Sequence, residues 1–445
     1  TVHKIYDKVG ITSDRTKNIT KHVIYSFIYK GGSILASFLL VPLTINFLDT
    51  ENYGIWLTLS SFIAWFSFFD IGLGNGLRNK FAEAKAKGDI KLAKAYVSSA
   101  YYTIGAVSLG LIVVFFILNF FIDWTKVFNA TASLQKELNI LMPIVFGFFC
   151  LQLVTKLITT IYTADQQHST QGKITFLTNI SSLLVIWIMT KTTESSLLLF
   201  GTIFSVLPVL ILLAFNFIGF NKRYTNFKPS IALWKREYLK DIFGLGLKFF
   251  AIQMAAIVLY STDNIIIAQL YSPAEVTPYF LAFKYFSIVT MGFTIIITPF
   301  WSAITEAYTQ KDIVWIKKSM NNLIKIALIF AVVAFLMIFS AKWVLSIWVG
   351  DRIEVPQLLI VLMSIFVITS VITQPFTYFI NGTGNVNIQL VLGAIGALLN
   401  IPLSIFFATK LDLGISGVIL ATIVANGIGL FVYPIYYKKT IQKIE

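Results

Sequence analysis

The chain has 445 residues, of which 57% are hydrophobic and 13% charged, and its mean hydropathy is +0.78. A soluble fold of this length cannot bury so much apolar surface, so the composition excludes a soluble globular protein and predicts a polytopic membrane protein. The formal net charge of +14 does not indicate nucleic-acid binding, because the basic residues lie in short loops between apolar runs. The single cysteine, Cys150, excludes a disulfide within the chain and the usual zinc and redox motifs.

Apolar runs of about 20 residues, the length that crosses the hydrocarbon core of a bilayer, recur along the whole chain. They predict an all-α membrane protein with twelve transmembrane helices, six in each half. The expected spans lie near residues 23–48, 53–74, 96–122, 138–164, 174–190, 196–219, 242–271, 278–303, 321–349, 357–380, 388–409 and 415–437. Residues 1–22 are polar and basic with no apolar core, so no cleavable signal peptide is expected.

A charged segment between two apolar runs occurs once in each half of the chain. Residues Glu83, Ala84, Asp89, Ile90 and Lys94 are matched, 223 positions later, by Glu306, Ala307, Asp312, Ile313 and Lys317. This repeat predicts two similar six-helix bundles. Because six is even, the two bundles insert the same way up, which makes them related by a pseudo-two-fold axis along the membrane normal.

Along the chain, loops that are rich in lysine and arginine alternate with loops that are poor in them. The poor loops hold only Lys126, Lys136, Lys191, Arg352 and Lys410, and the N-terminus and the remaining loops hold many more. The positive-inside rule therefore places both termini in the cytoplasm. The predicted domains are a cytoplasmic N-terminal segment (1–22), an N-terminal six-helix bundle (23–220), a cytoplasmic linker (221–241), a C-terminal six-helix bundle (242–437) and a cytoplasmic tail (438–445).

The linker allows two interpretations. Trp234, Tyr238 and Leu239 stand among basic residues, which is typical of an interfacial helix on an acidic membrane leaflet. A plain loop that follows the positive-inside rule explains the same residues equally well.

Four lysines lie deep within predicted spans: Lys30, Lys156, Lys248 and Lys284. A charge at the centre of a membrane helix costs about 2.5–3.5 kcal/mol on insertion scales, so such residues usually face a wet cavity or a partner. Ser33, Ser37 and Thr44 follow Lys30 at helical spacing and predict a small, polar face. These lysines are the candidate substrate-binding residues of a cationic cavity, with a purely structural role as the alternative.

Two acidic residues lie within predicted spans, Asp70 and Asp263. Asp263 and Lys284 both lie toward the outer side of neighbouring helices, which allows a plain ion pair. Asp70 lies at the inner end of its span, where it could be solvated from the cytoplasm or could pair with Arg78. A role in ion coupling is the other interpretation of both carboxylates. No metal site and no catalytic site are expected, because His3, His22 and His168 are isolated and no converging set of catalytic side chains is seen.

A run in the first half carries a family resemblance. Tyr53, Gly54, Ile55 and Trp56, followed by Asp70, Gly72, Leu73, Gly74, Asn75, Gly76, Asn79, Ala82, Gly88 and Asp89, resemble the second span and first cytoplasmic loop of bacterial polysaccharide transporters. These are the O-antigen flippases of the multidrug/oligosaccharidyl-lipid/polysaccharide exporter superfamily.

The resemblance implies a flippase in the bacterial inner membrane. It implies translocation of an undecaprenyl-pyrophosphate-linked oligosaccharide, such as an O-antigen or capsule repeat unit, by alternating access. The family's basic lumen residues are thought to hold the pyrophosphate or acidic sugars. That role falls here on Lys30 and Lys248 and, less directly, on Lys156 and Lys284. The resemblance further implies coupling to an H⁺ or Na⁺ gradient without another cofactor. The expected partners are the lipid-linked oligosaccharide, membrane lipids and the polysaccharide assembly machinery.

Two alternatives remain at this stage. A multidrug-type exporter of organic cations would favour acidic groups facing its substrate, and four deep lysines against two acids disfavour it. A membrane enzyme acting on lipid-linked sugars would need converging carboxylates or histidines, which the sequence does not show. The glycan, the coupling ion and the oligomeric state do not follow from the sequence.

Overall fold

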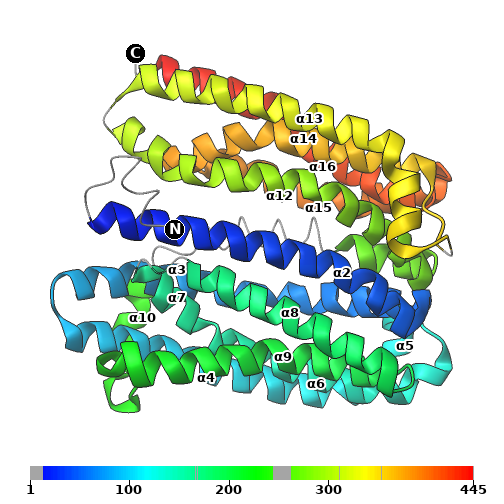
Figure 1. Cartoon of the computed structure of the whole chain (residues 1–445), viewed down its shortest axis with the longest axis horizontal. Helices are drawn as coiled ribbons and strands as arrows, with labels where there is room; N and C mark the ends of the chain where they lie inside the picture. The colour runs from blue at the N-terminus through cyan, green and yellow to red at the C-terminus, as the bar shows by residue number, and fades with distance from the viewer. Residues whose placement is uncertain are drawn as a thin grey trace. The chain divides into compact units, whose positions relative to one another are not determined.

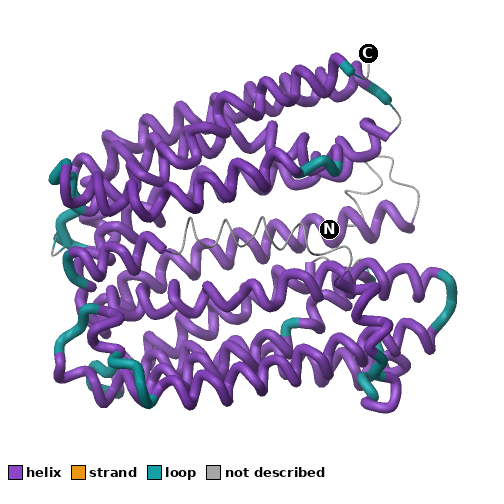
Figure 2. The backbone as a smooth tube through the Cα atoms, turned by 180° about the vertical axis from the view of Figure 1, so that it is seen from behind, coloured by secondary structure: helices purple, strands orange, loops and turns teal. Residues whose placement is uncertain are grey.

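The computed structural model describes residues 14–165, 167, 169–243, 262–309, 311–351 and 353–443. All regular secondary structure in these residues is helical, as Figure 2 shows. In lipid, a helix satisfies its backbone donors and acceptors internally, which is why apolar runs of this length fold in this way. The all-α class predicted from the sequence is confirmed.

The described residues contain ten helices that are long and apolar enough to cross a membrane. Their length and apolar composition confirm the prediction of a multi-pass membrane protein. Their bounds are Ile28–Ala64, Ile90–Asn119, Ala132–Ala164, Ser169–Thr192, Leu197–Arg223, Pro273–Thr298, Ile313–Val349, Gln357–Thr383, Asn387–Lys410 and Ile415–Gln442.

The first two predicted spans run into each other without a loop. Helix α2 (Asp14–Ala64) changes direction at Asp49, whose backbone angles are φ 70° and ψ 175°. A short 3₁₀ turn (Trp65–Ser67) then leads into α3 (Phe68–Ala86). The predicted span near 53–74 is therefore divided between the end of α2 and the start of α3.

The chain forms two compact units, and the first takes in the described parts of Thr1–Asp49, Phe66–Thr125 and Thr131–Phe250. In Figure 1, α4 (Ile90–Asn119), α6 (Gln135–Thr155), α8 (Ser169–Thr192) and α9 (Leu197–Ile218) run alongside one another. At one end, the last part of α3 packs on the first turns of α4 and on α7 (Leu157–Ala164). This core includes Leu77, Phe81, Ala84, Tyr96, Leu157 and Tyr224, all buried.

The second unit takes in the described parts of Thr50–Trp65, Lys126–Ala130 and Ala251–Glu445. Its described helices, besides residues 262–270, are α12 (Pro273–Thr309), α13 (Ile313–Val349), α14 (Gln357–Thr383), α15 (Asn387–Ile405) and α16 (Ile415–Gln442). The end of α12, the start of α13 and the ends of α14 and α16 share one apolar core. It includes Ile304, Ala307, Ile316, Met320, Phe379 and Ile441.

The repeated charged segment folds the same way in both units. The amide of Asp89 donates to the carbonyl of Ala84 at 3.0 Å, and the amide of Asp312 donates to that of Ala307 at 2.8 Å. The residue before each aspartate is left-handed, with φ 75° at Gly88 and φ 57° at Lys311. Such a residue ends a helix by turning the chain back on itself.

The two aspartates also cap the helices that follow. Asp89 accepts a hydrogen bond from the amide of Leu92 at 2.9 Å, and Asp312 accepts one from the amide of Trp315 at 3.0 Å. An aspartate at this position satisfies one of the free amides at a helix N-terminus. The sequence repeat is thus a repeat of local structure, a left-handed turn followed by an N-cap.

Two glycines of the segment that resembles bacterial polysaccharide transporters lie in close contact with the backbone of another helical segment. A Cβ at Gly54 would come 1.7 Å from the carbonyl oxygen of Pro273, and one at Gly76 would come 1.9 Å from that of Ile242. Gly54 therefore allows close packing on the start of α12, and Gly76 allows it on α10 (Arg236–Phe243). A side chain at either position would collide with a backbone carbonyl group, which explains both glycines.

The linker folds back onto the first unit. The indole of Trp234 donates to Thr103 Oγ1 at 2.9 Å, and the amide of Lys235 donates to Ser99 Oγ at 3.2 Å. The rings of Tyr238 and Tyr96 meet edge to face at 5.3 Å. The apolar side of α10 is thus directed at α3 and α4, and the linker is more than a plain loop.

The repeated N-cap gives a test of this local structure. Replacing Asp312 with Ala leaves the amide of Trp315 without its side-chain acceptor, so the free energy of unfolding should fall by about 1 kcal/mol. Asp312→Asn should stay close to the wild type, because asparagine caps equally well. Thermal unfolding of the detergent-purified variants measures both, and an equal loss in Asn and Ala would contradict the capping role.

Candidate functional site

Lys30 lies on α2 in the first unit, and its side chain is exposed. Ser33, one turn further on, is only 9% exposed. The side-chain amide of Asn179 on α8 donates to the carbonyl oxygen of Ser33 at 3.1 Å and to its hydroxyl at 2.8 Å. Thr44 is also buried and donates to the carbonyl of Leu40 at 2.8 Å. Helix packing therefore encloses Ser33 and Thr44, which lie on the small, polar face predicted from the sequence.

Lys156 stands at the junction of α6 and α7. Its amide donates to the carbonyl of Gln152 at 2.9 Å, and its own carbonyl accepts from the amide of Thr159 at 2.9 Å and from its hydroxyl at 2.8 Å. The Lys156 side chain is exposed. The exposed lysine side chain therefore lies at the break between α6 and α7 in the first unit.

The second unit contributes Lys284. It lies on α12 with a half-buried side chain, and its carbonyl accepts a hydrogen bond from Ser287 Oγ at 2.7 Å. Lys248 lies outside the described residues. Of the four predicted cavity lysines, the structure places Lys30 and Lys156 in the first unit and Lys284 in the second.

Asp263 is buried in the second unit, with 4% of its surface exposed. Its Oδ2 accepts hydrogen bonds from the hydroxyl of Tyr279 at 2.5 Å and from Thr422 Oγ1 at 3.3 Å. Thr422 Oγ1 in turn accepts from Asn400 Nδ2 at 2.8 Å. Neutral donors, rather than Lys284, therefore contact Asp263, so the plain ion pair allowed by the sequence is not formed. Asp70 lies on α3, and its side chain is outside the described part of the structure.

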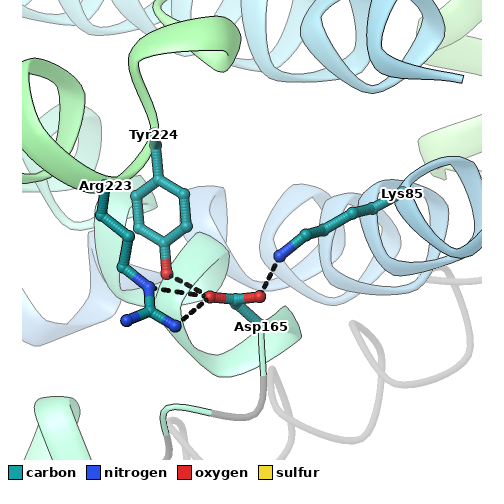
Figure 3. Close-up of polar contacts among 4 residues, drawn as sticks. All are labelled: Lys85, Asp165, Arg223 and Tyr224. Atoms are coloured by element: carbon teal, nitrogen blue, oxygen red, sulfur yellow. Dashed lines mark hydrogen bonds and ion pairs between the residues drawn. The ribbon is translucent and has the colours of Figure 1, made fainter. Parts of the chain in front are cut away.

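A second acidic residue, which the sequence did not single out, joins three segments of the first unit. Asp165 follows α7, and its carboxylate meets the side chains of Lys85, Arg223 and Tyr224 (Figure 3). Lys85 pairs with Oδ1 from one side. On the other side, Arg223 Nε donates to Oδ2 at 3.0 Å and Tyr224 donates to the same oxygen at 3.0 Å.

The Asp165 cluster is partly withdrawn from water. The Asp165 side chain is 12% exposed, against 40% for Lys85 and 50% for Arg223. Burial acts to raise the pKa of Asp165, but hydrogen bonds from Lys85, Arg223 and Tyr224 outweigh it and hold that pKa below its usual value. Burial, with the nearby Asp165 carboxylate, raises the pKa of the Tyr224 hydroxyl. The carboxylate is thus held ionised between the ends of α3, α7 and α9.

Sequence reasoning missed this cluster because it treated Lys85 and Arg223 only as markers of topology. The partners are far apart in the chain: Lys85 and Asp165 are 80 positions apart, and Asp165 and Arg223 are 58 positions apart. The only signal was an acidic residue at the end of a predicted span, close to an otherwise basic loop.

A family model described as polysaccharide biosynthesis protein matches residues 19–305, more than half of the chain. The chain belongs to this family. A second model, MatE, matches residues 250–406. The resemblance drawn from the segment around Gly54 and Gly76 is therefore confirmed.

Curated relatives of this polysaccharide biosynthesis family protein are transporters. A protein of Salmonella typhimurium described as an O-antigen transporter is 23% identical over 87% of this chain and 88% of its own length. A protein of Yersinia pseudotuberculosis described as an O-antigen export protein is 21% identical over 79% of this chain and 80% of its own. The family member is accordingly a membrane transporter and not an enzyme.

Solved structures agree on the fold. An inward-facing multidrug resistance MATE family transporter of the MOP superfamily matches with a TM-score of 0.77 at 15% identity, over 95% of this chain and 98% of that one. A MOP superfamily transporter from Pyrococcus furiosus matches with a TM-score of 0.67 at 16% identity, over 97% of each chain. The fold is that of the MOP superfamily.

The Asp165 cluster predicts a pH-dependent contribution to stability. Asp165→Asn removes a charged acceptor from two cations and a phenol, so the free energy of unfolding near pH 7 should fall by about 1–3 kcal/mol. Because the pKa of Asp165 is lower in the folded state, this contribution is complete above the unfolded-state value of about 3.9 and is lost as pH falls through the folded value. When unfolding is measured from about pH 8 to pH 3, the free energies of unfolding of the wild type and Asp165→Asn should become equal only below about pH 4.

The matched control for the Asp165 variant is Glu83→Gln, which neutralises an exposed carboxylate paired with Lys87 at 2.7 Å. An exposed pair of this kind contributes little, so Glu83→Gln should resemble the wild type. Equal stability of Asp165→Asn and the wild type at pH 7 would contradict a structural role for the cluster.

Proposed function

We propose that this protein is a flippase that moves an undecaprenyl-pyrophosphate-linked oligosaccharide from the inner to the outer leaflet of the bacterial inner membrane by alternating access. The observation that carries the proposal is the match of the polysaccharide biosynthesis family model over residues 19–305. It is supported by relatives described as an O-antigen transporter and an O-antigen export protein, each covering most of this chain.

The charge of the substrate sets the physical problem. A pyrophosphate carries at least two negative charges, and moving it unpaired through hydrocarbon costs far more than contacts to the lipid tail return. Fixed positive charge along the route lowers that cost by replacing the water that the headgroup loses. The prenyl tail remains in lipid throughout.

The lysines within the spans supply this positive charge in the proposal. Lys30 and Lys248, one from each half, hold the pyrophosphate when the cavity is open to the cytoplasm. Lys156 and Lys284 extend the cationic lining. The exposed side chains of Lys30 and Lys156 support the assignment, since a lysine enclosed by helix packing would have no access to a substrate.

The proposed architecture has twelve transmembrane helices in two six-helix bundles, with both termini cytoplasmic. The repeated turn and cap at Asp89 and Asp312 support two homologous halves. The apolar cores that bury Ala84 in one unit and Ala307 in the other support it further, because both gather equivalent helix ends. The end of α2 and the start of α3 together form the predicted span 53–74, and helical residues 262–270 form part of the predicted span 242–271.

A multidrug-type exporter is the second candidate, because the MatE model matches residues 250–406 and the structural neighbours include multidrug resistance transporters. An organic cation would meet a repulsive lining of lysines. Of the two acidic residues within the predicted spans, Asp263 is the one whose side chain the structure describes, and it is buried and engaged by Tyr279 and Thr422. These charges favour an anionic substrate.

Removing the proposed clamp should stop export. Lys30→Ala and Lys248→Ala should each reduce surface glycan by at least about 10-fold in a strain that lacks its own flippase, because an unpaired phosphate charge costs more than 1.4 kcal/mol in a dry site. Arginine at either position should retain more export than alanine, since the charge is kept. Surface glycan is measured with protein level in the membrane as the reference.

A lysine near the end of a span provides the control for the clamp. Lys342 lies on α13 with an exposed side chain, and Lys342→Ala should leave export unchanged. Wild-type export by both Lys30→Ala and Lys248→Ala at normal protein levels would remove the clamp.

The orientation can be tested by fusing reporters along the chain. A reporter active only in the cytoplasm should work after Lys87, Arg236 or Lys439, and one active only outside should work after Thr131 or Asp351. An external signal after Arg236 would contradict the six-plus-six scheme.

A further inference from the structure

A groove of about 750 Å³ lies in the first unit, between α4 and the linker. One wall consists of residues 101–109 of α4, and the other consists of Pro229, Ile231 and Trp234 of the linker. The lining is largely apolar, and some of its side chains are well exposed, with 64% for Leu109 and 66% for Ile231. The groove is therefore an open apolar surface and not part of a packed core.

Hydrogen bonds hold the linker wall in place. The amide of Ser230 donates to Ser98 Oγ at 3.0 Å, in addition to the bonds from Trp234 and Lys235 described above. These bonds attach the linker to α4 on both sides of the short 3₁₀ turn Ile231–Leu233. The groove is thus formed before an occupant arrives, as is usual for binding sites.

One end of the groove lies in the apolar part of α4. Val107 and Leu109 stand in the middle of Ile90–Asn119, a helix apolar enough to cross a membrane. Their exposed side chains contact acyl chains once the helix spans a bilayer. An occupant must therefore be apolar at this end.

The linker end of the groove is bordered by positive charge. Lys228, Lys235 and Arg236 adjoin the lining residues of the linker, all three are exposed, and residues 228–236 contain no acidic side chain. Lys235 pairs with Glu237 at 3.3 Å, but both side chains are exposed and a pair of this kind is weak. An occupant with negative charge at this end is therefore favoured.

We propose that the groove binds one anionic phospholipid from the membrane leaflet on the linker's side. An acyl chain lies along residues 101–109, and the phosphate lies near Lys228, Lys235 and Arg236. A zwitterionic phospholipid would fit the apolar wall equally well, but it has no net charge for the basic residues to attract. A soluble protein partner would not reach Leu109, which faces hydrocarbon in a bilayer.

The lipid site goes beyond the proposed function, because binding at this groove requires neither the glycan nor the lysines of the clamp. A lipid that contacts both α4 and the linker stabilises the linker in its position on the first unit. The linker joins the two halves of the chain, so its attachment to one of them becomes dependent on the lipid composition of the membrane.

The charge at the linker end can be tested by native mass spectrometry of the full-length protein in detergent. Phosphatidylglycerol and phosphatidylethanolamine with identical acyl chains are titrated separately. One molecule of phosphatidylglycerol should bind with a Kd about 10-fold or more below that of phosphatidylethanolamine. The combined variant Lys228→Gln, Lys235→Gln and Arg236→Gln should lose this preference. Its control, Lys317→Gln with Lys318→Gln, removes two exposed lysines of the second unit and should keep it.

The apolar wall can be tested by filling the groove. A Cβ at Gly105, a lining residue, meets no atom within 4 Å, so Gly105→Leu places a side chain in the groove without a backbone clash. This variant should raise the Kd for phosphatidylglycerol by about 10-fold or more. Gly110→Leu is the matched control, because Gly110 has the same free space on α4 but lies outside the lining.

The melting temperatures of the two glycine variants separate lost binding from misfolding. Leucine favours a helix over glycine, so without added lipid neither variant should melt below the wild type. Equal Kd values of the wild type for the two lipids would overturn the proposal, as would unchanged phosphatidylglycerol binding in both Gly105→Leu and the Gln variant. A dimer of the wild type that Gly105→Leu abolishes would also overturn it, because a second copy of the chain would then occupy the groove.

Discussion

The cost of an uncompensated charge in an apolar medium is the constraint on which this protein's structure depends. The ten apolar helices of the described residues carry few charged side chains, and each of these must be solvated or paired with a group of opposite charge or a hydrogen-bond donor. Asp165 is paired with two cations where helices end, and Asp263 is engaged by neutral donors inside the second unit. Lys30 and Lys156, by contrast, carry exposed side chains. The proposed transport of an anionic lipid headgroup would have to meet the same constraint.

The features that depend on local sequence could be predicted. Hydropathy located the helices because a membrane span needs only length and apolar composition. The charged repeat around Asp89 and Asp312 predicted equivalent hinges, and both form the same turn and cap, because these depend on residues within five positions of each other. The family-like glycines Gly54 and Gly76 were recognised by pattern, and the structure supplies their reason in close backbone contacts.

The features that depend on tertiary contact could not be predicted. Asp263 and Thr422 are 159 positions apart, and nothing in the sequence indicates that a threonine rather than Lys284 would reach the carboxylate. Helical spacing placed Ser33 on the same face as Lys30, but it could not show that Asn179 covers this serine. Periodic spacing shows which residues share one face of a helix. It does not show which other helix packs against that face.

The central claim is movement of a lipid-linked anionic glycan. It is tested most directly by reconstituting the purified protein in liposomes that carry a labelled polyprenyl-pyrophosphate oligosaccharide, with the glycan exposed to a glycosidase that cannot cross the membrane. The protein should move the protected fraction of the lipid across the membrane, so that all of the glycan becomes cleavable with time, while protein-free liposomes keep about half protected. A protected fraction that stays constant in the presence of folded protein would contradict movement of a lipid-linked glycan. Transport of organic cations by the same protein would contradict it as well.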